Sequence, residues 1–226
     1  MIYLDIDYMD RYKDFTIDKN RFPDFEGLVR ELKAKGIRLI PIIDAAIKVE
    51  EGYEVYDEGV KNNRFCKDKE GKEFIVGVWP GDSVLPDVLN KETREWFGEK
   101  YKILLDKGIE GFWNDMNEPS LFYSKQNFVK CINEIAEKKG KDLQAEDFNH
   151  INYLLSQLAN NEEDFKSFYH NADGKTISHD KVHNVYGYLL TRAAAEYFEK
   201  YNPNKKYLLF SRSSSIGMHR YGGIWM

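Results

Sequence analysis

The order of strands and helices is the feature that most constrains how this chain can fold. Apolar runs predict four strands, at residues 2–7, 37–44, 109–113 and 207–211. Amphipathic segments predict a helix between each pair, at residues 25–35, 91–107 and about 182–201. Strands that alternate with helices imply parallel β-α-β units.

The connections between these elements are unequal in length. Each helix-to-strand connection is short, whereas the two long excursions, at about 45–89 and 119–180, both follow strands. Polar residues end the strands, namely Asp5 and Asp7, Asp44, Asp115, and Arg212. This layout is typical of a (β/α)8 TIM barrel, whose strand-to-helix loops build the active site. The predicted fold class is α/β, a partial barrel of about four to five strands. Residues 222–226 would be the start of the fifth strand. No glycine-rich phosphate loop follows a strand, which disfavours a doubly wound sheet.

The stretch GFWNDMNEP, at 111–119, places two carboxylates, Asp115 and Glu118, just after a buried strand and close to Trp113. Carboxylates serve glycoside chemistry as nucleophile or acid/base, and an indole can cover the apolar face of a sugar ring. The structural alternative is that Asp115 and Asn117 are turn residues and that Glu118 caps the next segment of the chain.

The stretch GFWNDMNEPS resembles the nucleophile signature of glycoside hydrolase family 31, which contains retaining α-glucosidases and α-xylosidases. Further similar stretches occur in the family's order, namely LDIDYMDRYKDFT at 4–16, LIPIIDAAI at 39–47, VWPG at 78–81 and FSRSSSIGMHRYGGIWM at 210–226. The chain most resembles the bacterial intracellular α-glucosidases of that family. The resemblance implies hydrolysis of terminal α-linked glucose with retention, without a cofactor.

Residue roles follow from the same resemblance. Asp115 would be the nucleophile, Asp5 would bind sugar hydroxyls, and Arg212 would contact both the sugar and the catalytic carboxylates. Further positions match residues that line the sugar pocket, namely Ile42, Trp79, Trp113, Met116 and Trp225. We expect Asp7, Asp44 and Glu118 to support the site.

The resemblance also implies that part of the site is missing. The acid/base aspartate belongs to a Trp-x-Gly-Asp segment and would come two residues beyond Met226. We therefore expect residues 1–226 to be the central part of one (β/α)8 catalytic domain, without its N- and C-terminal parts. One alternative is a non-catalytic truncated fragment. The other is a barrel enzyme that binds a divalent metal through Asp5, Asp44, Asp115 and Glu118.

Composition limits the remaining possibilities. A net charge of −5 gives no basic surface for nucleic acid or anionic membrane, and no apolar run approaches the ~20 residues of a membrane span. Cys66 and Cys131 lie far apart, which favours a reducing compartment and a cytoplasmic location. The charge-rich stretch at 133–181 is interpreted as a solvated insertion; association of subunits into a homo-oligomer is the alternative. We interpret the five histidines as polar loop or helix residues and expect no metal; they are His150, His170, His179, His183 and His219.

Overall fold

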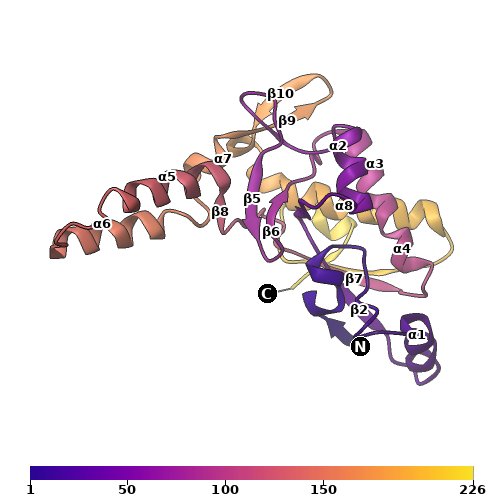
Figure 1. Cartoon of the computed structure of the whole chain (residues 1–226). Coiled ribbons are helices and arrows are strands. Elements are labelled where there is room, and N and C mark those ends of the chain that lie inside the picture. The colour runs from indigo at the N-terminus through magenta and orange to yellow at the C-terminus, as the bar shows by residue number, and fades with distance from the viewer. Residues whose placement is uncertain (226) are drawn as a thin grey trace.

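The computed structural model describes residues 1–225, and its centre is a parallel sheet of five strands (Figure 1). The strands are β1 (Ile2–Leu4), β2 (Leu39–Asp44), β7 (Gly111–Asp115), β11 (Leu208–Ser211) and β12 (Gly223–Ile224). Each strand pairs in parallel with the next one along the chain. This singly wound order is that of an arc of a (β/α)8 barrel, whereas a doubly wound sheet reverses direction at a switch point. The α/β class and the partial barrel are confirmed.

Two details of the predicted strands are corrected. The strand expected at 2–7 ends at Leu4, because the Asp5 side chain accepts the backbone N–H of Ile6 at 2.7 Å and begins the 3₁₀ turn η1 (Ile6–Tyr8). A second turn, η2 (Asp10–Tyr12), follows. The fifth strand, expected at 222–226, covers Gly223–Ile224, and Met226 lies outside the described residues.

Helices on the outer face connect the strands, namely α1 (Phe25–Ala34), α3 (Lys91–Lys100), α4 (Lys102–Leu105) and α8 (His183–Tyr201). The Asn90 side chain caps α3 by accepting the backbone N–H of Thr93 at 3.1 Å. The helix expected to run to residue 107 is divided in two at Tyr101. A short turn, η4 (Met218–Arg220), takes the place of a helix between β11 and β12.

Aromatic rings hold the sheet against these helices. Phe112 of β7 stacks on Phe198 of α8 with ring centroids 5.4 Å apart, and Tyr101 meets Phe112 edge-on at 5.0 Å. A Cβ on Gly98 would lie 2.3 Å from the carbonyl oxygen of Ala193, so the glycine allows α3 and α8 to pack closely. The outer face of the sheet is therefore the buried core that fixes the strand ends in place.

The two excursions fold together beyond the carboxyl ends of the strands. The first contains β3 (Ile47–Lys48), α2 (Glu54–Lys61), β4 (Lys67–Asp68), β5 (Ile75–Val78) and β6 (Gly81–Val84). The second contains β8 (Tyr123–Ser124), α5 (Lys125–Ala136), α6 (Ala145–Ser156), α7 (Glu162–Phe165), β9 (Phe168–Ala172), β10 (Lys175–Ser178) and the turn η3 (His179–Lys181). Two antiparallel sheets combine strands of both excursions, in the orders β3-β6-β5-β8 and β10-β9-β4.

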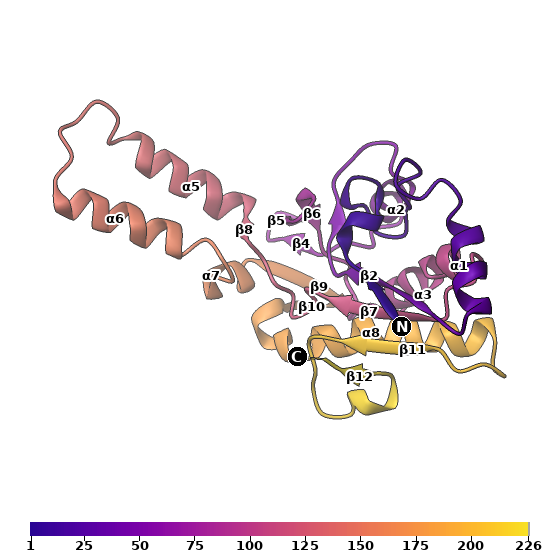
Figure 2. The same ribbon diagram turned by 90° about the horizontal axis from the view of Figure 1, so that it is seen from below.

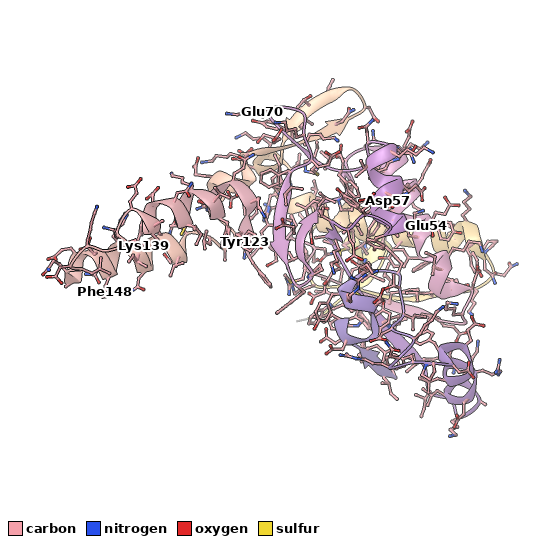
Figure 3. All side chains as sticks on the ribbon, in the orientation of Figure 1. Glu54, Asp57, Glu70, Tyr123, Lys139 and Phe148 are labelled. Atoms are coloured by element: carbon pink, nitrogen blue, oxygen red, sulfur yellow. The ribbon has the colours of Figure 1, made fainter. Side chains whose placement is uncertain are left out.

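Helices α5 and α6 form an arm that extends away from the sheet, as Figure 2 shows. Large apolar side chains are exposed along it, including Val129, Ile132 and Tyr153. Figure 3 shows Lys139 and Phe148 toward the far end of this arm and Tyr123 at its base. Across the described residues, none of the helices combines the length and apolar character needed to span a bilayer.

Candidate active site

The period of two along each strand puts the predicted site residues on one face of the sheet. In the register between β2 and β7, Ile42 is opposite Trp113 and Asp44 is opposite Asp115. Residues directly opposite each other in paired strands point to the same side. Asp44 and Asp115 therefore share the face that is turned away from the outer helices.

Arg212 joins this face from the end of β11. Its backbone N–H donates to the Asn114 carbonyl at 3.0 Å, and its Nη1 lies 2.9 Å from Asp115 Oδ1. The Nε and Nη2 atoms each donate to a different carboxylate oxygen of Glu118, both at 2.9 Å. One guanidinium thus binds both carboxylates of the GFWNDMNEP stretch, a geometry that its planar fork allows and a lysine does not.

Burial and the guanidinium act in opposite directions on these two carboxyls. Burial raises the pKa of Asp115, and the Met116 N–H and Arg212 offset part of that increase. Burial also raises the pKa of Glu118, but the hydrogen bonds and charge of Arg212 outweigh it, so the net pKa lies below its usual value. Arg212 thus makes two of its three carboxylate contacts with Glu118, and the pKa of Asp115 stays above its usual value.

Asp44 is the most deeply buried carboxyl at the strand ends. Burial first, and then the charges of Asp115 and Asp5, raise its pKa to about 7, while Arg212 lowers it. Its backbone N–H donates to Asp14 Oδ1 at 2.9 Å. Its own Oδ1 is buried and has no partner in the described part of the chain.

The two acidic residues after β1 lie in different surroundings. Asp5 is exposed and close enough to raise the pKa of both Asp44 and Asp115. Asp7 is exposed in η1, where its carboxylate pairs with Arg21 Nη1 at 2.8 Å. The supporting role expected for Asp7 stays a prediction; its carboxylate pairs with Arg21 because the chain turns into a 3₁₀ conformation after Leu4.

Aromatic side chains line the same face one layer below the carboxylates. A cavity of about 270 Å³ is bordered by Tyr3, Trp113, Phe210 and Trp225. The rings of Trp113 and Trp225 meet at 5.1 Å, and Trp113 Nε1 donates to the Leu4 carbonyl at 3.2 Å. Ile42 is buried opposite Trp113.

Two further predicted pocket residues lie beside this layer. Met116 has a left-handed backbone, with φ of 53°, and its sulfur lies 3.3 Å from Arg212 Nη2. Left-handed backbone is uncommon for a non-glycine residue, and it turns the chain sharply after Asp115. Trp79 is half exposed in the β5–β6 hairpin, where its ring meets Phe122 edge-on at 4.9 Å. Phe122 comes four residues after Glu118, so this pair borders the loop that carries Glu118.

Residues that the sequence interpretation missed lie behind the site. Asn117 is fully buried; its Nδ2 donates to Ser211 Oγ at 2.8 Å and its Oδ1 accepts from the Ser213 N–H at 3.0 Å. The interpretation as a polar loop or helix residue is wrong for His170, which lies in strand β9; its ring is buried and hydrogen-bonded at 2.9 Å to the buried ring of His179. The four-residue spacing of His179 and His183 was a usable signal in the sequence.

The geometry can also be compared with the alternative hypothesis of a barrel enzyme that binds a divalent metal. Among the described residues, the cluster whose ligand atoms lie within 4.8 Å of one another is Cys66, Asp87 and His170, away from the strand ends. At the strand ends, Arg212 supplies a cation that binds Asp115 and Glu118 directly. This arrangement favours carboxylates that act on a substrate over carboxylates that hold an ion.

A singly wound parallel sheet that carries clustered carboxylates, an arginine and tryptophans at its strand ends defines a (β/α)-barrel domain of the glycoside hydrolase type. The comparison with family models is specific: the model of the glycosyl hydrolases family 31 TIM-barrel domain matches residues 1–226. The chain belongs to glycoside hydrolase family 31.

Two similar proteins are α-glucosidases. Alpha-glucosidase 2 of Bacillus thermoamyloliquefaciens is 37% identical over 226 residues, which cover 100% of this chain and 24% of that protein. An alpha-glucosidase of Saccharolobus solfataricus is 32% identical, covering 99% of this chain and 30% of that protein. The chain thus spans about a quarter to a third of the length of these relatives.

Solved structures agree with this assignment. The structure of the heterodimeric ER glucosidase II complex matches with a TM-score of 0.72 and 29% identity, covering 99% of this chain and 21% of that chain. A family 31 dextranase of Flavobacterium johnsoniae, complexed with glucose, matches with a TM-score of 0.72 and 25% identity, covering 99% and 23% respectively.

Proposed function

We propose that the full-length protein containing this chain hydrolyses terminal α-linked glucose with retention of configuration, and that residues 1–226 are the central part of its (β/α)8 catalytic domain. The observation that carries the proposal is the contact of Arg212 with both Asp115 and Glu118 on the inner face of the sheet. The α-glucosidase relatives support the substrate class.

Asp115 is the proposed nucleophile. A carboxylate oxygen of Asp115 forms a bond to the anomeric carbon as the glycosidic C–O bond breaks, and an acid/base carboxyl delivers a proton to the departing oxygen. Water then attacks the same carbon, gives its proton to the acid/base group and releases Asp115. The acid/base aspartate is proposed to lie beyond Met226, in agreement with the resemblance of the 210–226 stretch to the family.

Arg212 and its neighbours prepare the nucleophile. The Arg212 guanidinium favours the charged form of Asp115 against the effect of burial. Its bidentate bond to Glu118 fixes the position from which it does so. We assign to Asp5 the binding of sugar hydroxyls, since it is exposed beside Asp115, and to Asp44 a supporting role opposite Asp115 on the neighbouring strand.

The apolar layer is the proposed floor of the sugar pocket. The rings of Trp113 and Trp225 offer a surface for the C–H face of a pyranose. Ile42 and Met116 close the pocket beneath the carboxylates, and Trp79 stands at its margin with Phe122. A cytoplasmic location is part of the proposal and is supported by two unpaired cysteines, Cys66 and Cys131.

Covalent trapping tests the nucleophile directly. A fluorinated α-glucosyl fluoride releases fluoride without needing a general acid, so Asp115 can form the glycosyl ester even where proton donation is weak. We expect the full-length protein to gain the mass of one fluorinated glucosyl group, and peptide mapping to locate it on Asp115. The matched variant Asp115→Asn should fold normally and show neither labelling nor hydrolysis.

The other outcomes separate the alternatives. Labelling of the full-length protein but not of the 226-residue chain would support the view of the chain as a non-catalytic fragment. Near-normal turnover by Asp115→Asn would exclude Asp115 as the nucleophile. Activity that disappears with a chelator and returns with a divalent cation would favour the metal-binding barrel.

A further inference from the structure

A buried side-chain amide links the two chain segments that carry Asp115 and Arg212. Asn117 Nδ2 donates to Ser211 Oγ at 2.8 Å, and Asn117 Oδ1 accepts the backbone N–H of Ser213 at 3.0 Å. These partners are 94 and 96 residues away from Asn117 along the chain. They stand on either side of Arg212 in the sequence, so one side chain binds both residues that flank the arginine.

The partners fix the orientation of the Asn117 amide. A backbone N–H can only donate, so the amide oxygen faces Ser213 and the amide nitrogen faces Ser211. The Ser211 hydroxyl gives its one proton to the Ser213 carbonyl at 2.7 Å and accepts from Asn117 with a lone pair. The three residues therefore form a closed ring of neutral hydrogen bonds, here called the amide ring, which contains no group that titrates.

Burial makes the amide ring difficult to open. Asn117 and Ser211 are both fully buried. Helix α8 covers the ring from behind, since a Cβ on Gly187 would lie 2.6 Å from the Asn117 carbonyl oxygen and 2.7 Å from Ser213 Cβ. Water is not at hand to replace a lost partner, so removing one member leaves buried donors or acceptors without a hydrogen bond.

The ion pairs of Arg212 are less well protected than the amide ring. The ladder between β7 and β11 ends with Ser211 opposite Asn114, and the Arg212 N–H donates to the Asn114 carbonyl at 3.0 Å. Beyond that point the side chains of Arg212, Asp115 and Glu118 are 31%, 12% and 35% exposed. Water screens ion pairs that are partly exposed, and holding long side chains in one geometry is entropically unfavourable. The buried ring is not screened, so it holds the backbone on both sides of the ion pairs.

We propose that Asn117 is a positioning residue, which holds the Arg212 guanidinium at contact distance from Asp115 by tying together the two chain segments that carry them. The inference rests on the proposed function, because it assigns Asn117 a part in the same reaction. Since Asn117 is fully buried, it acts through Arg212 and not on the sugar itself.

Truncation of the amide in the full-length protein tests the proposal. Asn117→Ala removes both side-chain links and adds no bulk. We expect kcat on an aryl α-glucoside to fall by about tenfold or more, with KM within about threefold of wild type, because a misplaced catalytic group loses rate steeply. Ser211→Ala breaks one of the two links and should cause a smaller loss of kcat.

Tyr101→Phe is the matched control for the loss of a buried hydrogen bond. The Tyr101 hydroxyl donates to Asn114 Oδ1 at 2.7 Å in the core, where both residues are fully buried. We expect this variant to have a lowered Tm, as Asn117→Ala does, but unchanged kcat and KM. The comparison therefore separates positioning from stability.

A double-mutant cycle tests whether Asn117 acts through Arg212. Arg212→Ala removes the guanidinium, so nothing is left for Asn117 to position. Adding Asn117→Ala to Arg212→Ala should lower kcat by less than about twofold more, because both changes disturb one interaction.

The outcomes are distinguishable. A kcat of Asn117→Ala within about twofold of wild type, at a lowered Tm, would show a structural role alone and overturn the proposal. Losses of kcat that multiply in the double variant would also overturn it. If Asn117→Ala does not fold, Ser211→Ala takes its place in the cycle, and a wild-type kcat in that variant would overturn the proposal. Near-normal turnover by Asp115→Asn would instead refute the proposed function, whatever the Asn117 variants show.

Discussion

Arg212 is the residue on which the proposed chemistry depends most. It binds Asp115 Oδ1 at 2.9 Å and both oxygens of Glu118, also at 2.9 Å. Three of its nitrogens are therefore used at once, by two carboxylates that come from one loop. A residue with a single charged nitrogen cannot satisfy both partners in this geometry.

Arg212→Lys in the full-length protein should lower kcat/KM by about 10² to 10³, the size of loss that accompanies removal of one preorganised charge contact. The loss should appear mainly in kcat, because the missing contacts stabilise developing charge at Asp115. Steady-state kinetics on an aryl α-glucoside measures it. Arg192→Lys, whose Nε pairs with Glu196 at 2.6 Å on the outside of α8, is the matched control. A change below twofold in Arg212→Lys would count against the assigned role.

Asp44 should make stability depend on pH. Its pKa in the folded state is about 7, against a usual value of 3.8, so the folded state binds this proton more tightly than the unfolded state. The free energy of unfolding therefore falls as pH rises from about 4 to about 7. Asp44→Asn should be more stable than wild type at pH 8, by at most about 4 kcal/mol, and nearly equal at pH 4.

Thermal unfolding of the full-length protein at the two pH values measures this difference. The exposed Asp142→Asn on the arm is the control and should match wild type at both. Equal stability of Asp44→Asn and wild type at pH 8 would show that Asp44 is not held in a raised-pKa environment.

At the level of elements, local patterns predicted the barrel units well and the excursions poorly. The cap at Asn90 and the strand that ends at Asp115 follow from residues adjacent in sequence. The β5–β8 and β4–β9 pairings join two-residue strands to segments more than 40 residues away. Strands this short carry no periodicity that a sequence can display.

At the site, too, some positions could be predicted from local sequence and others could not. Register and alternation place Asp44, Asp115 and Arg212 on one face as the strand-end pattern predicted. The turn that sends Asp7 toward Arg21 depends on a single side chain, Asp5, capping the next residue. The roles of these residues in catalysis stay predictions until the variants are measured.

Helix α8 determines how firmly the loop that carries Asn117 and Glu118 is held. Gly187 lies against Asn117 and Ser213, and a methyl group there would come within 2.7 Å of both. Gly187→Ala should therefore lower the free energy of unfolding by about 2 kcal/mol, although alanine favours helix by about 1 kcal/mol over glycine.

The same substitution should reduce kcat, since the displaced loop carries Glu118. Thermal unfolding and steady-state kinetics of the full-length protein test both expectations together. Glu199→Ala, at an exposed position of α8, is the control for the change in helix propensity. A more stable Gly187→Ala would show that the helix and the loop can move apart at no cost.

At the scale of the whole molecule, the open sheet has an apolar inner face that the described residues 1–225 leave uncovered. The cavity lined by Tyr3, Trp113, Phe210 and Trp225 opens on the inner side of the sheet. Tyr3 on β1 and Ile224 on β12 are both about half exposed, at the two edges. Unpaired edges and exposed apolar faces favour association between copies.

The 226-residue chain on its own should therefore bind a hydrophobic dye and self-associate at micromolar concentration, whereas the full-length protein should do neither through this face. Light scattering and dye fluorescence measure both properties. Ile224→Lys places a charge at the β12 edge and should reduce association. Ile132→Lys on the arm is the matched comparison, because Ile132 is 44% exposed, close to the 52% of Ile224. If Ile132→Lys alone reduced association, the arm and not the open sheet would be the contact between copies.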